Sequence, residues 1–137
     1  MTTKSETLSD AVSAFAAQWF QYLDVHAPAD RLAGCLATDG LVMVFPERTL
    51  RSVDEFRDWY RTVCGLYTDE THEIEEVTPT VADDRIDVAV SVIWRATQTA
   101  DGSRLAMRAK QTWRLARTPS GPGLVITEYR VDDLADL

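Results

Sequence analysis

Histidine is the side chain best suited to move protons near neutral pH, and the chain has only two, His26 and His72. His26 lies close to Asp24 at the end of an apolar-striped segment, where the dipole of a helix carboxyl end also favours a histidine. It therefore has either a structural role or a role in a pocket. His72 shares a strand face with Ile74, whereas Glu73 points to the other face. This pattern is compatible with a pocket-lining imidazole, although a lone histidine on an apolar face is more often a core residue.

Gln111 is a polar exception on an apolar strand face. Alternate positions of residues 86–96 and 105–115 are otherwise apolar, as in strands with one buried side. A buried amide without a hydrogen-bond partner costs about 1–3 kcal/mol. Gln111 therefore either anchors a neighbour, such as Asp24, His26 or a helix carbonyl, or faces a cavity.

Three tryptophans, Trp19, Trp94 and Trp113, fall on the inward faces of three separate elements. They meet in the core or line its open end. If they line a cavity together with Tyr22, the ligand that fits best is a flat or cyclic apolar molecule with one or two polar groups, oriented by Gln111, His72 and Asp24.

Patterns typical of other chemistry are lacking in the sequence. The two histidines and the dispersed carboxylates have no metal-ligand spacing, and neither a glycine-rich phosphate loop nor a nucleophile elbow is present. Cys35 and Cys64 have no CxxC spacing and suit small buried apolar residues in a reducing compartment. We expect neither a metal nor a cofactor.

The formal net charge of −8 over 137 residues disfavours nucleic acid and anionic membrane surfaces as partners. A basic strand face at Arg108, Lys110 and Arg114 is either solvated or a subunit contact. No apolar run approaches the roughly 20 residues of a membrane span, and residues 1–6 are polar. We expect a cytoplasmic protein.

Helical periodicity is confined to the first half of the chain. Residues 8–25 carry an apolar stripe, residues 32–37 predict a short second helix, and residues 41–45 predict a strand closed by Pro46. Ser52 and Glu55 have capping-box spacing at the start of a third helix that extends to about Tyr67. These segments would supply the helices that cover one face of a sheet.

Period-two alternation dominates the rest of the chain, over residues 71–81, 86–98, 104–117 and 124–132. Turn signals at residues 83–84, 101–102 and 120–123 predict antiparallel hairpins between them. The sequence thus predicts a single α+β domain over residues 1–137, with a curved, mainly antiparallel sheet wrapped around the N-terminal helices. A sheet wrapped around a helix leaves an open end for a pocket.

The order of elements carries a resemblance to a known family, together with five short stretches: Tyr22-Leu23-Asp24, Thr38-Asp39-Gly40-Leu41, Phe45-Pro46, Ser52-Val53-Asp54-Glu55-Phe56 and Thr71-His72. The chain resembles the nuclear transport factor 2-like superfamily, particularly its SnoaL-like branch. The resemblance implies a cone-shaped domain, often dimeric through its sheet, with a pocket between sheet and helices. It covers steroid isomerases, cyclases, dehydratases and non-catalytic binding domains, so it does not fix the chemistry.

The resemblance also implies roles for particular residues. Tyr22 and Asp24 match a tyrosine and an aspartate of dehydratase-like members, and His72 matches the histidine that opens their first long strand. The asparagine that often follows a few residues later is absent. The proton-shuttling aspartate of the steroid isomerases matches Phe45, and their second acid falls near Gln111, so that mechanism lacks a base here.

Two functions follow from the sequence. The first is a cofactor-independent lyase, cyclase or isomerase acting on a small cyclic apolar substrate, with Asp24 and His72 transferring protons while Tyr22, His26 and Gln111 orient the substrate. The second is a non-catalytic ligand-binding or dimerising module. In either case we expect a homodimer through the sheet, in which the basic face would meet an acidic face at Glu73 and Glu75.

Overall fold

The period-two alternation of the second half of the chain builds four long antiparallel strands. In the computed structural model, which describes residues 4–118 and 123–137, these are β3 (Tyr67–Ala82), β4 (Arg85–Gln98), β5 (Arg104–Arg117) and β6 (Leu124–Asp136). Two short strands, β1 (Val42–Phe45) and β2 (Arg48–Leu50), extend the sheet to the order β2-β1-β6-β5-β4-β3. β1 runs parallel to β6, while the other neighbouring strands are antiparallel.

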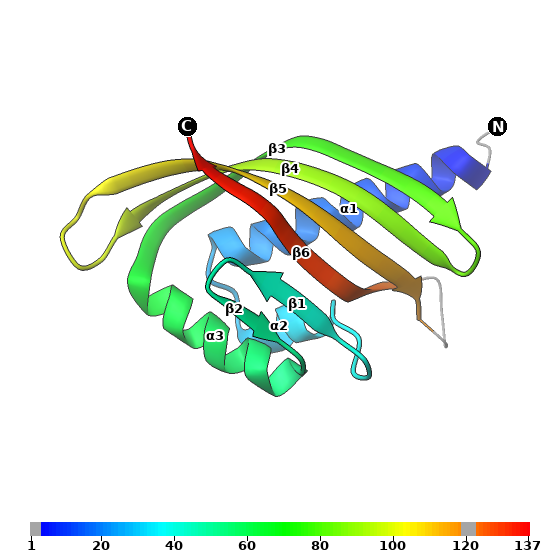
Figure 1. The fold of residues 1–137 in the computed structure, drawn as a ribbon, viewed down its shortest axis with the longest axis horizontal. Coiled ribbons are helices and arrows are strands. Elements are labelled where there is room, and N and C mark those ends of the chain that lie inside the picture. The colour runs from blue at the N-terminus through cyan, green and yellow to red at the C-terminus, as the bar shows by residue number, and fades with distance from the viewer. Residues whose placement is uncertain (1–3, 119–122) are drawn as a thin grey trace.

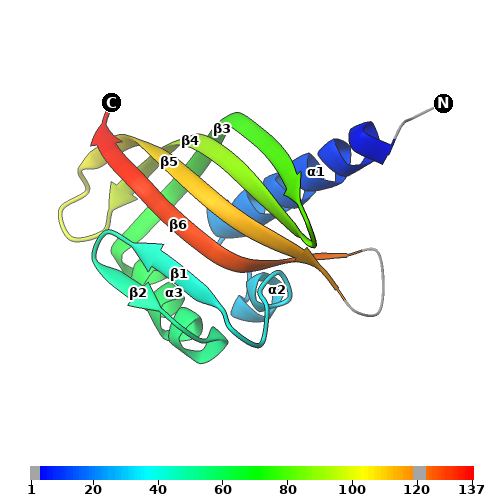
Figure 2. The same ribbon diagram turned by 45° about the vertical axis from the view of Figure 1, so that its right-hand side comes forward.

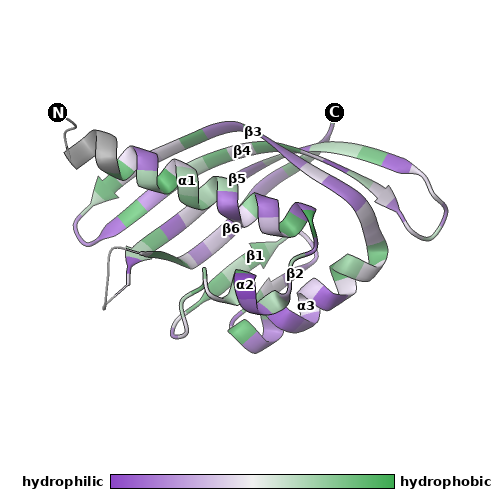
Figure 3. Ribbon diagram, turned by 180° about the vertical axis from the view of Figure 1, so that it is seen from behind, coloured by the Kyte–Doolittle hydropathy of each residue, from purple (hydrophilic) through white to green (hydrophobic). Residues whose placement is uncertain are grey.

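The long strands arch over the first helix, α1 (Lys4–Asp24), which crosses the concave face of the sheet (Figures 1 and 3). The helices α2 (Ala29–Ala33) and α3 (Val53–Leu66) lie below, beside β1 and β2 (Figures 1 and 2). This is the predicted α+β arrangement, a curved sheet wrapped around N-terminal helices in a cone. At one end of the concave face, α3 lies next to the sheet in place of α1.

The core forms where α1 meets the inner face of the sheet. On α1, the buried residues Val12, Ala16, Trp19 and Phe20 follow the predicted helical stripe. On β4 and β5 the predicted alternation is confirmed, because the inward positions of both strands are largely buried: Ile86, Val88, Val90, Val92, Ala96, Ala109, Gln111, Trp113 and Leu115. Burying these side chains supplies the main driving force for folding.

One of the two hydrogen bonds of the predicted capping box of α3 is confirmed. The Ser52 hydroxyl accepts a hydrogen bond from the backbone N–H of Glu55 at 3.1 Å, as a capping box requires. The Glu55 carboxylate instead accepts from the backbone N–H of Arg51 at 2.9 Å. Both acceptors satisfy N–H groups around the first turn of α3, which fixes where the helix begins.

The outer face of the sheet pairs its charges within the chain. Arg108 contacts Glu75 through two hydrogen bonds of 2.8 and 3.0 Å, and Arg95 lies 3.1 Å from Glu73. The hydrogen bond from Arg108 lowers the pKa of the Glu75 carboxyl below its ordinary value. The carboxylates that we expected to meet a second subunit's cations are therefore already occupied in one chain.

Several element boundaries differ from the sequence prediction. Strand β2 was not predicted, α2 begins and ends a few residues earlier than expected, and β3 begins four residues earlier. The hairpin signal at residues 120–123 lies largely outside the described residues. Cys35 and Cys64 are free and only half-buried, and none of the described helices is long and apolar enough to cross a membrane.

Candidate active site

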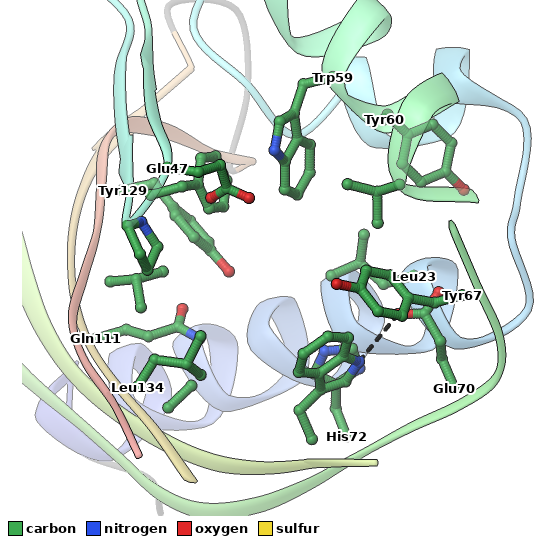
Figure 4. A pocket seen from close by; sticks show the side chains of 16 residues that line it. Leu23, Glu47, Trp59, Tyr60, Tyr67, Glu70, His72, Gln111, Tyr129 and Leu134 are labelled. Atoms are coloured by element: carbon green, nitrogen blue, oxygen red, sulfur yellow. Dashed lines mark hydrogen bonds between the residues drawn. The ribbon is translucent and has the colours of Figure 1, made fainter. Parts of the chain in front are cut away.

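A cavity of about 160 Å³ lies between the end of α1, α3 and the inner face of the sheet. It is bounded by the end of α1, by α3, by the β1–β2 turn and by the inner face of β3 to β6 (Figure 4). Its lining is largely aromatic and aliphatic, and Glu47, Glu70, His72 and Gln111 add a carboxylate, a second carboxylate, an imidazole and an amide. The residues that line it are Leu23, Phe45, Pro46, Glu47, Trp59, Tyr60, Val63, Tyr67, Glu70, His72, Trp94, Ala109, Gln111, Tyr129, Val131 and Leu134. Such a wall is typical of sites for small organic ligands.

His72 and Asp24 form an imidazole–carboxylate pair at the cavity wall. The Nδ1 atom of His72 lies 2.6 Å from Oδ1 of Asp24, and the backbone N–H of His72 donates to Oδ2 at 3.3 Å. A carboxylate can only accept, so Nδ1 carries the proton and Nε2 is the basic nitrogen. Phe20 stacks on the imidazole at 4.9 Å between ring centroids and holds the plane of the ring.

A second pair, His26 and Glu70, lies next to the first. Nε2 of His26 is 2.5 Å from Oε2 of Glu70, and the indole N–H of Trp94 donates to Oε1 of Glu70 at 3.0 Å. Glu70 is only 8% exposed, so these two partners compensate for most of the water that burial removes. Glu70 faces the cavity, whereas His26 supports it from behind.

Two residues in the left-handed backbone region bring this second pair together. His26, with φ of 51°, ends α1 in a Schellman motif, because the N–H of Ala27 bonds to the carbonyl of Tyr22 at 2.9 Å. Asp69, with φ of 50°, lies at a bulge where β3 gains one residue on β4. After this bulge, Glu70 and His72 both face inward, two residues apart.

Gln111 and Tyr129 lie on the side of the cavity opposite His72 and Glu70 (Figure 4). The amide oxygen of Gln111 accepts from the indole N–H of Trp113 at 2.9 Å. Burial raises the pKa of Tyr129 well above its ordinary value. Tyr129 therefore stays a neutral hydroxyl that can donate a hydrogen bond.

The residues singled out in the sequence are divided between the cavity and the core. His72, Trp94 and Gln111 line the cavity, and Asp24 reaches it through His72. Trp19 and Trp113 are 1% and 0% exposed and pack in the core instead of the wall. Tyr22 also packs, partly buried, against the core.

Gln111 contacts neither of the polar partners considered for it in the sequence. Asp24 is held by His72 and His26 by Glu70, while Gln111 is held by Trp113. Gln111 thus has both features that the sequence left as alternatives, because it anchors a neighbour and faces a cavity.

Sequence reasoning missed Glu70, Trp59 and Tyr129 as lining residues. Glu70 stands two positions before His72, so the alternation that placed His72 inward could have indicated it. Trp59 and Tyr129 reach the cavity from α3 and β6, and their positions depend on how those elements pack. Glu47, an exposed residue of the β1–β2 turn, also lines the cavity.

The wall of the cavity offers side chains that can transfer a proton. Over the described ranges, no three His, Cys, Asp or Glu side chains come together in a cluster that could hold a metal ion. Phe45 lines the cavity where the resemblance to steroid isomerases would require a base. The basic nitrogen that the wall does offer is Nε2 of His72, and the side chains of Gln111 and Tyr129 lie on the other side of the cavity (Figure 4).

No protein-family model and no curated protein matches the chain. Solved structures do. A scytalone dehydratase-like protein from Novosphingobium aromaticivorans matches with a TM-score of 0.85 at 11% identity, over 100% of this chain and 92% of that one. A nuclear transport factor 2-like superfamily protein from Salmonella enterica serovar Typhimurium gives 0.81 at 13% identity, over 96% and 92%. A type 2 hexachlorocyclohexane dehydrochlorinase, LinA, gives 0.80 at 13% identity, over 96% and 89%.

These matches establish the fold. The chain has the cone-shaped fold of the nuclear transport factor 2-like superfamily, which confirms the resemblance drawn from the sequence. The neighbours include a dehydrochlorinase and a dehydratase-like protein, so the fold is one that carries ligand-binding and catalytic sites.

Proposed function

We propose that this protein is a cofactor-independent lyase that removes a proton from a small cyclic apolar substrate. The observation that carries the proposal is the contact of 2.6 Å between Nδ1 of His72 and Asp24 at the wall of an apolar cavity. An acceptor on Nδ1 fixes the tautomer in which Nε2 is free to take a proton, and it stabilises the imidazolium that results. His72 is the base and Asp24 its orienting partner.

The opposite wall would stabilise the charge that proton removal creates. When a proton leaves a carbon beside a carbonyl group, negative charge develops on the carbonyl oxygen. The Tyr129 hydroxyl and the Gln111 amide, on the side facing His72, can donate hydrogen bonds to that oxygen. Burial keeps Tyr129 protonated and therefore able to donate.

An elimination completes the reaction without any further reagent. As His72 takes the proton, the electrons of the C–H bond form a carbon–carbon double bond, and a hydroxyl group on the next carbon leaves with its bonding pair. The proton on His72 then passes to the departing hydroxide and forms water, which returns the imidazole to its starting state. The names of two structural neighbours, a dehydrochlorinase and a dehydratase-like protein, describe eliminations of the same kind.

A simple cyclic probe tests this proposal. We expect the protein to convert 3-hydroxycyclohexanone into 2-cyclohexenone, whose conjugated enone is followed by ultraviolet absorbance. His72→Gln should lower the rate about 100-fold, as loss of a general base usually does, and Asp24→Asn should lower it less. Glu73→Gln, on the outer face of the same strand, is the matched control. Equal rates for the parent chain and His72→Gln would contradict the assignment.

A non-catalytic ligand-binding module is the second candidate. It is favoured by one observation: Asp24 and His26 tie the end of α1 to β3, so both imidazole–carboxylate pairs also have a structural use. Under this alternative the cavity binds cyclic ligands, but neither the parent chain nor His72→Gln converts them into a product. His72→Gln then differs from the parent only in stability.

A further inference from the structure

We propose that Glu70 selects the class of ligand: it accepts a hydrogen bond from a hydroxyl or ammonium group on a neutral or cationic ring, and it excludes anionic rings. This inference rests on the proposed ring-binding cavity. The inference specifies the charge of the ligand and the residue that discriminates between ligands by their charge.

The first argument is the charge of the wall. Glu47 and Glu70 line the cavity, and Asp24 stands directly behind His72. Among the described residues of the lining there is neither a lysine nor an arginine. With these three carboxyl groups ionised, even protonation of both His26 and His72 leaves one negative charge in excess.

The second argument is that Glu70 is held in place with acceptor capacity to spare. Its two oxygens are fixed by His26 and by the indole N–H of Trp94, so the carboxylate cannot rotate away from a ligand. A carboxylate offers about four lone-pair positions, of which these contacts use two. The others can accept from a ligand that enters the cavity.

The third argument is burial. The Glu70 side chain is 6% exposed, so water screens its charge poorly. An anionic ligand placed beside it would lose its hydration without gaining a cation. A hydroxyl or ammonium group would gain a charge-assisted hydrogen bond instead.

The size of the cavity limits the ligand to about one ring. An apolar cavity of about 150 Å³ is enough to hold benzene, and this one measures about 160 Å³. A six-membered ring with one polar substituent therefore fits, with the ring against Trp59 and Val63 and the substituent toward Glu70.

Three rings of nearly equal size and different charge form the test: cyclohexanol, cyclohexylamine as its cation at pH 7, and cyclohexanecarboxylate. Binding is measured by calorimetry and by the fluorescence of the wall tryptophans, Trp59 and Trp94. We expect the parent chain to bind the alcohol and the cation at least about tenfold more tightly than the carboxylate, since like charges in a poorly screened site repel strongly.

Glu70→Gln should reduce that preference about tenfold, because it removes the charge but keeps an oxygen that can accept from Trp94. Glu73→Gln removes one charge from the opposite face of the same strand, where Glu73 pairs with Arg95, and should keep the parent ranking. A preference for the alcohol and the cation over the carboxylate that is equally large in the two variants would overturn the proposal.

The parent chain decides the matter even if Glu70→Gln fails to fold. If the parent binds cyclohexanecarboxylate as tightly as cyclohexanol, the role of Glu70 is wrong while the cavity stands. If the parent binds none of the three rings, the proposed ring-binding cavity itself is wrong, and the role of Glu70 with it.

Discussion

Single hydrogen bonds decide how the polar residues of this cavity are held. Each has a protein partner and keeps further hydrogen-bonding capacity for a ligand. Asp24 holds Nδ1 of His72, Trp94 and His26 hold the two oxygens of Glu70, and Trp113 holds the amide oxygen of Gln111. Pre-organised groups of this kind need little rearrangement when charge develops during a reaction. Each of these hydrogen bonds also stabilises the fold, because removing one partner leaves the other buried and unpaired.

Gln111→Leu is expected to destabilise the fold by about 1–3 kcal/mol, because the buried indole N–H of Trp113 loses its acceptor. Urea unfolding measures the change. Ligand-induced quenching of tryptophan fluorescence, measured on the same variant, should also change, since Gln111 lines the cavity. A variant as stable as the parent would contradict the anchoring role, and unaltered quenching would contradict the contact with ligand.

Two elements position the candidate site, the carboxyl end of α1 and the bulged start of β3. The sequence allowed the helix, the strand and the inward face of His72 to be predicted, because hydrophobic periodicity depends on local spacing. It did not allow the pairing of His72 with Asp24, which are 48 residues apart, to be derived from spacing. The bulge at Asp69 was also missed, since nothing in the alternation shows which residue leaves the ladder.

The backbone at Asp69 gives a prediction about β3. Asp69→Val should cost about 1–2 kcal/mol, because an L side chain with a branched Cβ is strained at a φ of 50°. Asp69→Gly should leave stability unchanged or raise it slightly. Thr71→Val, a β-branched exchange elsewhere on the strand, is the control. Urea unfolding that shows no difference between Asp69→Val and Asp69→Gly would mean that the bulge does not hold this conformation.

Tyr60 ties α3 to the segment after α1, because its hydroxyl donates to the carbonyl of Ala27 at 2.6 Å. Tyr60→Phe should lower stability by about 0.5–1.5 kcal/mol. Tyr67→Phe, whose ring packs edge-on against Trp94, is the control. A loss of stability no greater than that of the control would contradict the role of this hydrogen bond.

The same residue predicts a response to alkaline pH. Burial raises the pKa of Tyr60 above its ordinary value, so the folded state keeps a proton that the unfolded state releases. The stability that Tyr60 contributes is therefore complete below the ordinary tyrosine pKa and is lost as the pH rises above it. Tyr60→Phe should lose less stability than the parent over that alkaline range.

At the scale of the whole molecule, the acidic balance of the chain contrasts with a sheet whose outer face is neutralised locally. The pairs of Arg108 with Glu75 and of Arg95 with Glu73 leave little charge for a partner to complement. A second copy that packed on this sheet would therefore have to rely on shape and apolar contact more than on the ion pairs that the sequence indicated. The homodimer through the sheet stays a proposal.

Light scattering at micromolar concentration measures the oligomeric state directly. We expect about twice the chain mass of 15.4 kDa. Because Arg108 and Arg114 of the basic face are already paired within the chain, the dimer should not dissociate as salt is raised. A mass near that of one chain would contradict the dimer, and dissociation in salt would restore the electrostatic contact first expected.

The central claim, that His72 takes a proton from a ring bound in the cavity, is tested most directly by deuterium exchange. Cyclohexanone is incubated with the protein in D₂O, and loss of the proton signals beside the carbonyl is followed by NMR. We predict exchange catalysed by the parent chain and by Glu73→Gln, and a rate about 100-fold lower for His72→Gln. Exchange that proceeds as fast with His72→Gln as with the parent would contradict the account.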